Sequence, residues 1–331
     1  MRLTVWILIP ILVIGAGVWF LMLRMPGTSH SGAAAPLTQR EEMLRDSLRR
    51  NVTNLAGEIG ERNLIRYEAL SAAAIYLEQQ LTEAGYKVER NDFEVSTPNG
   101  QRSTSNLIAE LKGAQKPSEI VVIGAHYDSR EGTPGADDNA SGVASALSLA
   151  RTFAHATPNR TLRFVFFTNE EYFREELMGS LVYAKLCRAR GDNIVAMVSL
   201  ETIGYFSDVA GSQKYPFPIN LFYPSTGNFL GFVGNIESRS MVHTAIRSFR
   251  TVATLPSQGV AAPEFIDEIG WSDQWSFWRQ NYPGIMITDT APFRNPNYHR
   301  PKDTPDTLDY GRLARVVTGV EAVVADLTAA K

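Results

Sequence analysis

Apolar residues recur along the chain in two patterns, short continuous runs and longer stretches with helical spacing. Short runs rich in β-branched and aromatic residues predict strands at 105–111, 119–125, 161–167, 194–200 and 284–289, and residues 86–95 predict another. Helical spacing predicts helices at 65–84, 145–156, 181–189 and 309–330. The first of these ends before Gly85, as helices commonly do.

Continuous apolar strands alternating with helices indicate an α/β fold. Such strands are buried on both sides, so we expect three layers, with a mostly parallel, mixed sheet between helices on both faces. The 331 residues suffice for one large domain with appendages. Sheets of this kind bind ligands at the carboxyl ends of their strands.

The N-terminal residues 3–23 form an uncharged, mostly apolar stretch between Arg2 and Arg24. About 20 apolar residues cross the hydrocarbon core of a bilayer, whereas the apolar part of a cleaved signal peptide is shorter. We therefore predict a transmembrane anchor at 1–25, a small and polar linker at 26–36 and a catalytic domain at 37–331. The expected product is a single-pass membrane protein with its catalytic domain exported, and cleavage near residues 33–35 is the less favoured alternative.

The charge and cysteine content narrow the possible partners and sites. The net charge is only −3 and no basic stripe is present, so we do not expect a nucleic-acid partner. The single cysteine, Cys187, excludes an internal disulfide and a metal site built from several cysteines. It lies in an apolar helical run, where it is expected to be a small buried residue.

Histidines and carboxylates follow four of the predicted strands. In chain order these polar residues are His126 and Asp128, then Asp138 in the segment GADDNASG, then Glu170 and Glu171, then Glu201, and finally Tyr298, His299 and Asp303. Because the carboxyl ends of parallel strands meet at one edge of a sheet, we expect these side chains to lie close together.

Carboxylates and imidazoles together are typical zinc ligands. Two cations about 3.5–4 Å apart need a bridging anion, which an aspartate can supply with its two oxygens. Asp138, Glu171 and Glu201 would offset much of the charge of two zinc ions. Glu170 is then free to act as a base. The sequence thus predicts a two-metal hydrolytic site.

The same string of motifs resembles a known family. H-x-D, G-A-D-D-x-x-S-G, N-E-E, L-E-x-I-G-Y and Y-H with a following D-T are similar to the co-catalytic zinc aminopeptidases, metallopeptidase family twenty-eight, over roughly residues 65 to 330. The resemblance implies the zinc-peptidase architecture, which is related to phosphorylases and hydrolases. It also implies an enzyme that acts on peptides.

The resemblance further implies a role for each site residue. Two zinc ions per chain would be bound by His126 and Glu201 at one position, by Glu171 and His299 at the other, and by Asp138 between them. Glu170 would be the general base and acid. Asp128 would orient the ring of His126. The hydroxyl of Tyr298 would help to stabilise the oxyanion.

Two segments depart from the family pattern. Many members carry aspartate where this chain has Glu201, which is longer by one methylene group. Relatives often carry a histidine after the aspartate of the segment 272–275, whose sequence here is SDQW, so we assign this segment to the pocket wall. The nearby aromatic residues fit equally well in a core or in an apolar side-chain pocket; they are Trp271, Trp275, Phe277 and Trp278.

The leading hypothesis is a membrane-anchored aminopeptidase that removes N-terminal residues from peptides. A dipeptidase or carboxypeptidase would need a basic residue for a carboxylate, for which the candidates are Arg130, Arg174 and Arg294. A glutaminyl cyclase of the family works with one zinc ion and has less need of the full ligand set. The intact set also argues against a non-catalytic binding ectodomain, and Ser141 lacks the G-x-S-x-G sequence of serine hydrolases. The sequence leaves the oligomeric state open.

Overall fold

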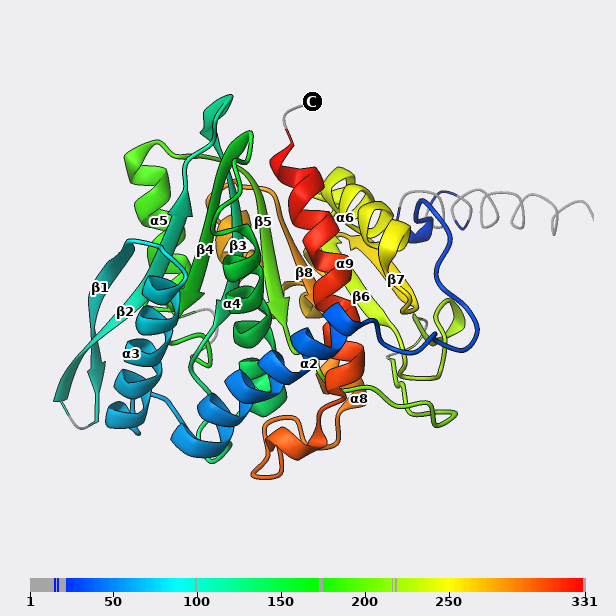
Figure 1. Ribbon diagram of the computed structural model, residues 1–331, viewed down its shortest axis with the longest axis horizontal. Coiled ribbons are helices and arrows are strands. Elements are labelled where there is room, and N and C mark those ends of the chain that lie inside the picture. The colour runs from blue at the N-terminus through cyan, green and yellow to red at the C-terminus, as the bar shows by residue number, and fades with distance from the viewer. Residues whose placement is uncertain are drawn as a thin grey trace, which may run out of the picture.

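A single mixed sheet forms the centre of the protein (Figure 1). The computed structural model describes residues 15, 17, 22–98, 100–172, 175–215, 217 and 219–329. In this part eight strands pair in the order β1-β2-β4-β3-β5-β8-β6-β7. They are β1 Val88–Thr97, β2 Gly100–Leu111, β3 Lys116–His126, β4 Arg160–Phe167, β5 Asn193–Glu201, β6 Leu230–Asn235, β7 Ser257–Ala262 and β8 Gly284–Thr288.

The strand directions bring four carboxyl ends to the same edge of the sheet. β3 runs parallel to both β4 and β5, and β5 runs parallel to β8. Antiparallel pairing joins β1 to β2, β2 to β4 and β6 to β8, while β7 runs parallel to β6. The predicted mixed, mostly parallel sheet is confirmed. Strands β6 and β7 were not predicted, because glycine and polar residues interrupt their apolar runs (LGFVGN and SQGVAA).

Helices cover both faces of the sheet, as predicted, and Figure 1 shows α2, α3, α4, α6 and α9 in front of it. Helices α5 and α7 pack on the other face, against β2, β5 and β8. The α-helices are α2 Gln39–Val52, α3 Tyr67–Glu83, α4 Gly142–Phe153, α5 Gly179–Arg190, α6 Arg239–Val252, α7 Gln274–Trp278, α8 Ala291–Arg294 and α9 Tyr310–Thr328. Short π or 3-10 turns are η2 Thr53–Ile59, η3 Ala136–Ser141, η4 Ile219–Leu221, η5 Asp267–Gly270 and η6 Pro305–Thr307.

Each face of the sheet has its own apolar core. The larger cluster lies under α2, α3, α4, α6 and α9 and includes the expected stripe of α9, from Leu313 to Val324. The smaller cluster lies under α5 and α7 and contains Phe167, Phe277 and Cys187, which is fully buried as expected. These two cores hold the central strands and therefore set the relative positions of their carboxyl ends.

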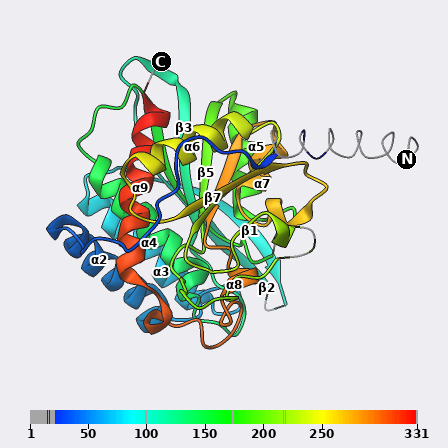
Figure 2. The same ribbon diagram turned by 90° about the vertical axis from the view of Figure 1, so that its right-hand side faces the viewer.

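The predicted membrane anchor falls almost entirely on residues outside the described part of the chain. Among the described residues, no helix has the length and apolar character needed to cross a membrane. The predicted linker, by contrast, is described, and it packs against the domain. Arg250 of α6 donates to the carbonyls of Pro26 (2.8 Å) and Gly27 (3.1 Å), and the backbone N–H of Ser257 donates to Ser29 Oγ (2.9 Å). Figure 2 shows this dark blue segment passing beside α6 on its way to α2.

Candidate metal centre

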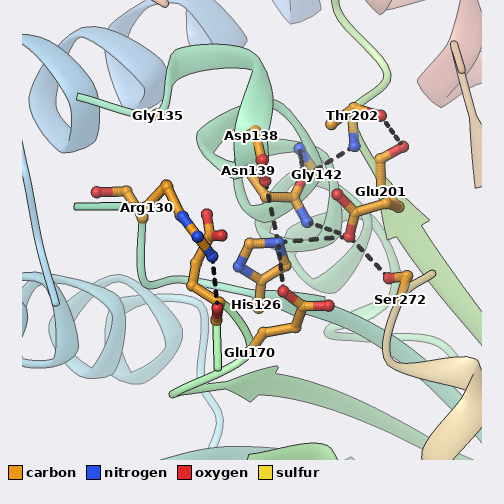
Figure 3. Close-up of polar contacts among 12 residues, drawn as sticks. His126, Arg130, Gly135, Asp138, Asn139, Gly142, Glu170, Glu201, Thr202 and Ser272 are labelled. Atoms are coloured by element: carbon orange, nitrogen blue, oxygen red, sulfur yellow. Dashed lines mark hydrogen bonds and ion pairs between the residues drawn. The ribbon is translucent and has the colours of Figure 1, made fainter. Parts of the chain in front are cut away.

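His126 is the last residue of β3 and is fully buried among acidic side chains (Figure 3). Its Nε2 lies 3.2 Å from Asp138 Oδ1 and 3.4 Å from Glu201 Oε2. Glu201 is the last residue of β5, the parallel neighbour of β3. One nitrogen and two carboxylate oxygens therefore converge on one point at the strand ends, an arrangement that can hold a metal ion.

Asp138 also takes part in a second cluster of the same kind. Its other oxygen, Oδ2, lies 2.9 Å from His299 Nε2, and this nitrogen lies 3.4 Å from Glu171 Oε2. Asp138, Glu171 and His299 offer three ligand atoms within 4.8 Å of one another, as do His126, Asp138 and Glu201. The structure thus brings all five predicted ligands together as two groups that share one aspartate.

Asp128 contacts both groups from behind. Its Oδ1 lies 3.4 Å from His126 Nδ1, on the side of the ring that faces away from Asp138. Its Oδ2 accepts a hydrogen bond of 3.2 Å from the backbone N–H of Glu171. Its position fits the predicted orienting role, since a carboxylate on the far nitrogen of a ligating imidazole sets the direction of the ring.

The loop that carries Asp138 is held by a carboxylate from far along the chain. Asp303 accepts hydrogen bonds from the backbone N–H groups of Asp137 (2.9 Å) and Asp138 (3.1 Å). The loop also needs Gly135, which has a φ of 63° and whose missing Cβ would lie 2.3 Å from the carbonyl oxygen of Asp138. Asp137 accepts from Asn295 Nδ2 and from Gly204 N–H, so its role is structural.

The other two predicted catalytic residues border the two groups. Glu170 follows β4 and is nearly buried, with Oε2 3.9 Å from His126 Nε2. Tyr298 stacks on the ring of His299 with 3.8 Å between the ring centroids. Each side chain therefore contacts the histidine of one of the two groups.

The electrostatics of this site favour a bound cation. Burial raises the pKa values of Glu170 and Glu171 well above their usual range, and neighbouring carboxylates raise them further. Burial alone would lower the pKa of His126, but Glu201 and Glu170 outweigh it and hold that pKa well above its usual value. The buried atoms His126 Nε2 and Glu171 Oε1 have no hydrogen-bond partner among the described residues. Divalent cations would satisfy these atoms and offset the crowded negative charge, so the residues fit a zinc site.

A match to a protein-family model identifies the family of this chain. Residues 106–324 match the model described as "Peptidase family M28". This chain belongs to peptidase family M28. The match confirms the resemblance to family twenty-eight and the prediction of a zinc metallopeptidase.

Relatives of this M28 peptidase include a bacterial protein of nearly the same extent. The Escherichia coli K12 protein "Uncharacterized protein YfbL" is 35% identical over 298 residues, which span 87% of this chain and 89% of that one. A "Probable zinc metalloprotease" of Pyrenophora teres is 30% identical over 56% of this chain, but the match spans only 44% of the fungal protein.

Solved structures show the same fold at low sequence identity. The zinc aminopeptidase BSAP from Bacillus subtilis superposes with a TM-score of 0.68 at 14% identity, over 87% of this chain and 95% of that one. A Bacteroides thetaiotaomicron glutaminyl cyclase superposes with a TM-score of 0.65 at 19% identity, over 85% and 97% of the two chains.

Three residues at or beside the M28 site were not predicted from the sequence to contact it. Ser272 Oγ donates a 2.7 Å hydrogen bond to Glu201 Oε2, so the segment assigned to the pocket wall also contacts a predicted ligand. Asp273 is fully buried with no hydrogen-bond partner for its carboxylate among the described residues, and it lies close enough to Glu170 to raise the pKa of that carboxyl. One feature of the sequence could have indicated Asp273: it is an acidic residue within an aromatic run (WSDQWSFW), where burial is expected.

Arg62 is the third residue that the sequence analysis missed. It is fully buried, and its guanidinium donates to the carbonyls of Tyr127 (2.6 Å), Pro134 (2.5 Å) and Gly135 (2.9 Å). It thus braces the chain between His126 and Asp138. No local motif distinguishes it from a surface arginine, so only the tertiary contacts show its role.

The predicted pocket residues separate into two groups. Phe277 is buried in the smaller core, whereas Trp278 is buried in a separate cluster with Ala262 and Ile269, against which Trp275 packs. Trp271 instead lines an apolar cavity of about 490 Å³ that reaches Glu201 and Tyr298 at the metal site. Trp271 also stacks on Phe293, with 6.2 Å between the ring centroids.

The candidate carboxylate-binding arginines differ in position. Arg130 is exposed and donates a 3.0 Å hydrogen bond to the carbonyl of Glu171. Arg294 is buried, and its Nε donates to Gln213 Oε1 (2.8 Å), so it is not available to a substrate. Arg174 lies outside the described residues. Of the two candidates that the structure describes, Arg130 is the one that lies exposed beside the site.

We expect the metal-free M28 peptidase to lose stability as the pH rises. Burial raises the pKa of Asp273 to about 7, and the pKa of Glu170 is also raised, so the folded state binds more protons than the unfolded state above about pH 4. The raised pKa of His126 acts in the same direction above about pH 6.5. Urea unfolding of chelator-treated protein at pH 5 and pH 8 should show lower stability at pH 8. Zinc should remove most of this difference, and an equal or higher stability of the metal-free protein at pH 8 would contradict the expectation.

Proposed function

We propose that this chain is a di-zinc aminopeptidase. The observation that carries the proposal is the position of Asp138, whose two oxygens face two separate groups, each completed by one histidine and one glutamate. A bridging carboxylate is the ligand that two closely spaced cations require. His126 and Glu201 would hold one zinc ion, and Glu171 and His299 would hold the other.

When bound, the zinc ions would polarise the peptide carbonyl and make a water molecule acidic enough to serve as the nucleophile. Glu170 would accept the proton of that water, and the 3.9 Å between its Oε2 and His126 Nε2 supports this role. Glu170 then carries the proton to the leaving amine.

Tyr298 would donate a hydrogen bond to the oxyanion. Burial and the negative charge of Asp138 raise the pKa of its hydroxyl well above the usual value, so the group keeps its proton. The tyrosine also lines the apolar cavity, where a hydrogen bond is stronger than in water. Tyr298 can therefore stabilise charge that develops during the reaction.

The cavity supports an apolar N-terminal residue as the preferred substrate. It begins at Glu201 and Tyr298 and continues between Trp271, Met286 and Phe293. Its volume of about 490 Å³ accommodates a large aliphatic or aromatic side chain. The free amine of the substrate would remain among the carboxylates of the metal site, which favours cleavage at the N-terminal peptide bond.

The anchor is a separate part of the proposal. Residues 3–23 carry no charge and match the thickness of a bilayer in length. We propose that they hold the domain at a membrane as an uncleaved anchor, with the catalytic domain exported.

A substrate panel tests the enzymatic part. We expect the purified chain to bind about two zinc ions and to hydrolyse leucyl-p-nitroanilide. Acetyl-leucyl-p-nitroanilide should be inert, because its amine is blocked. Alanyl and glutamyl substrates should show lower kcat/KM than leucyl and phenylalanyl substrates.

Other outcomes of the panel point to other functions. Hydrolysis of the acetylated substrate would rule out a requirement for the free amine. Cyclisation of an N-terminal glutamine peptide with one bound zinc ion would indicate a glutaminyl cyclase. Cleavage restricted to dipeptides or to carboxyl ends would direct attention to Arg130, the exposed arginine beside the site.

A further inference from the structure

Four exposed apolar side chains line the cavity or directly adjoin, in the chain, residues that line it. Phe217, Leu221, Phe222 and Phe265 are 81%, 66%, 55% and 86% exposed. Phe217 and Phe222 line the cavity, and the other two are the chain neighbours of lining residues, Leu221 of Phe222 and Phe265 of Ile266. We call these four residues the apolar rim. Several large apolar side chains exposed together commonly mark an interaction site.

The end of the uncharged N-terminal stretch lines the cavity that the apolar rim borders. Met22 and Leu23, at the end of that stretch, line the same cavity as Phe217 and Phe222. The next residues are fixed in place, since Met25 Sδ packs against Gly259 of β7 and Arg250 binds the carbonyls of Pro26 and Gly27. Residues 22–27 are therefore held beside the cavity that the rim borders.

We propose that the apolar rim inserts into the surface of the lipid bilayer that holds residues 3–23, so that the cavity opens at the membrane. This inference rests on the anchor in the proposed function. Apolar and aromatic side chains near a membrane-bound segment commonly sit about 5–10 Å deep, at the boundary between head groups and acyl chains. The substrates would then be peptides whose apolar N-termini partition to the bilayer surface.

Charge around the apolar rim indicates which bilayer it fits. Glu264, Asp267 and Glu268 surround Phe265 in the sequence, and Glu268 also lines the cavity. Acidic residues are repelled by anionic head groups, whereas polybasic segments are attracted to them. Insertion should therefore depend on apolar contact, and it should be as strong in zwitterionic lipid as in anionic lipid.

The test uses the full chain in nanodiscs that hold one copy each. Phe265→Cys is labelled with an environment-sensitive fluorophore, and Met43→Cys is the matched control, because Met43 is an apolar residue of α2 with 62% exposure. Cys187 is buried and should not react, which the labelling stoichiometry verifies. Nitroxide lipids then report contact with the bilayer, and iodide reports contact with water.

We expect nitroxide lipids to quench the label at position 265 and iodide to quench the label at position 43. Equal quenching at both positions, or a chain that does not enter the nanodisc, would overturn the proposal. Position 265 could also be protected from iodide only when a disc holds several copies of the chain. This result would show that a second copy covers the rim, and it would also overturn the proposal. Quenching that requires anionic lipid would overturn insertion by apolar contact.

Hydrolysis of leucyl-p-nitroanilide in the same samples separates this proposal from the proposed function. The Leu221→Ser/Phe265→Ser variant should keep the kcat/KM of the wild-type chain for this soluble substrate, because neither residue lines the cavity. The same double substitution should reduce nitroxide quenching of a label at Phe217→Cys. Normal hydrolysis without quenching by nitroxide lipids would reject membrane insertion of the apolar rim but not the aminopeptidase. Quenching by nitroxide lipids without hydrolysis would reject the aminopeptidase.

Discussion

Replacement of Glu170 by glutamine should sharply reduce turnover and leave the zinc content unchanged. The substitution preserves the size of the side chain but removes the group that accepts the proton. General acid–base catalysis typically contributes about 10²–10⁴-fold, so kcat should fall by that amount. Glu170 belongs to neither group of ligand atoms, which is why both metal positions should stay filled.

Metal analysis measures the zinc content of the Glu170→Gln variant, and hydrolysis of leucyl-p-nitroanilide measures its kcat. The matched control is Glu176→Gln, because the side chain of Glu176 is 86% exposed and pairs only with Lys185 in the described structure. The control should behave as the wild-type chain. A Glu170→Gln variant with full activity would disprove its role as the base, and one that loses zinc would show that Glu170 is a ligand.

The second large effect is expected from the shared aspartate. Asp138→Asn removes the negative charge between the two groups, and the neutral amide is a poor bridge between two cations. Both zinc ions should be lost or strongly weakened, with kcat/KM reduced by about 10³-fold or more. His126→Ala and His299→Ala should each weaken one position and leave the other, since each histidine belongs to one group.

Zinc content after dialysis, together with kcat/KM, tests this pattern. Asp306→Asn is the control, because Asp306 is an exposed aspartate in η6, outside both groups. It should retain the zinc content and activity of the wild-type chain. If Asp138→Asn lost only one zinc ion, Asp138 would be a ligand of a single metal, and the bridging arrangement would be wrong.

Local patterns in the sequence were sufficient for much of the fold. The apolar runs of β3, β4, β5 and β8 are short and continuous because these strands are buried on both faces, and this is a feature that a sequence records directly. The strand pattern also predicted the position of the site, because the residues that follow parallel strands lie at one edge of the sheet. His126 and Glu201 are two examples, each at the end of its strand.

Elements with mixed composition escaped this reasoning. β6 and β7 contain glycines and polar residues, so their strand character depends on pairing with β8 and with each other. The segment 26–36 has the small, polar composition of a linker, yet hydrogen bonds from Arg250 and Ser257 fix it to the domain. The composition of this segment does not predict such hydrogen bonds, because their partners come from distant parts of the chain.

The sequence by itself determined the α/β class, the residues at the strand ends and the kind of chemistry that they support. The tertiary structure decided that Asp138 faces both histidines, that Arg62 braces the loop before it, and that Asp273 is buried beside the site. It also joined the metal site to an apolar cavity whose far end meets the N-terminal segment. The physical reason is that periodicity and residue type are local properties, whereas the position of a side chain against a distant partner depends on how the whole core packs.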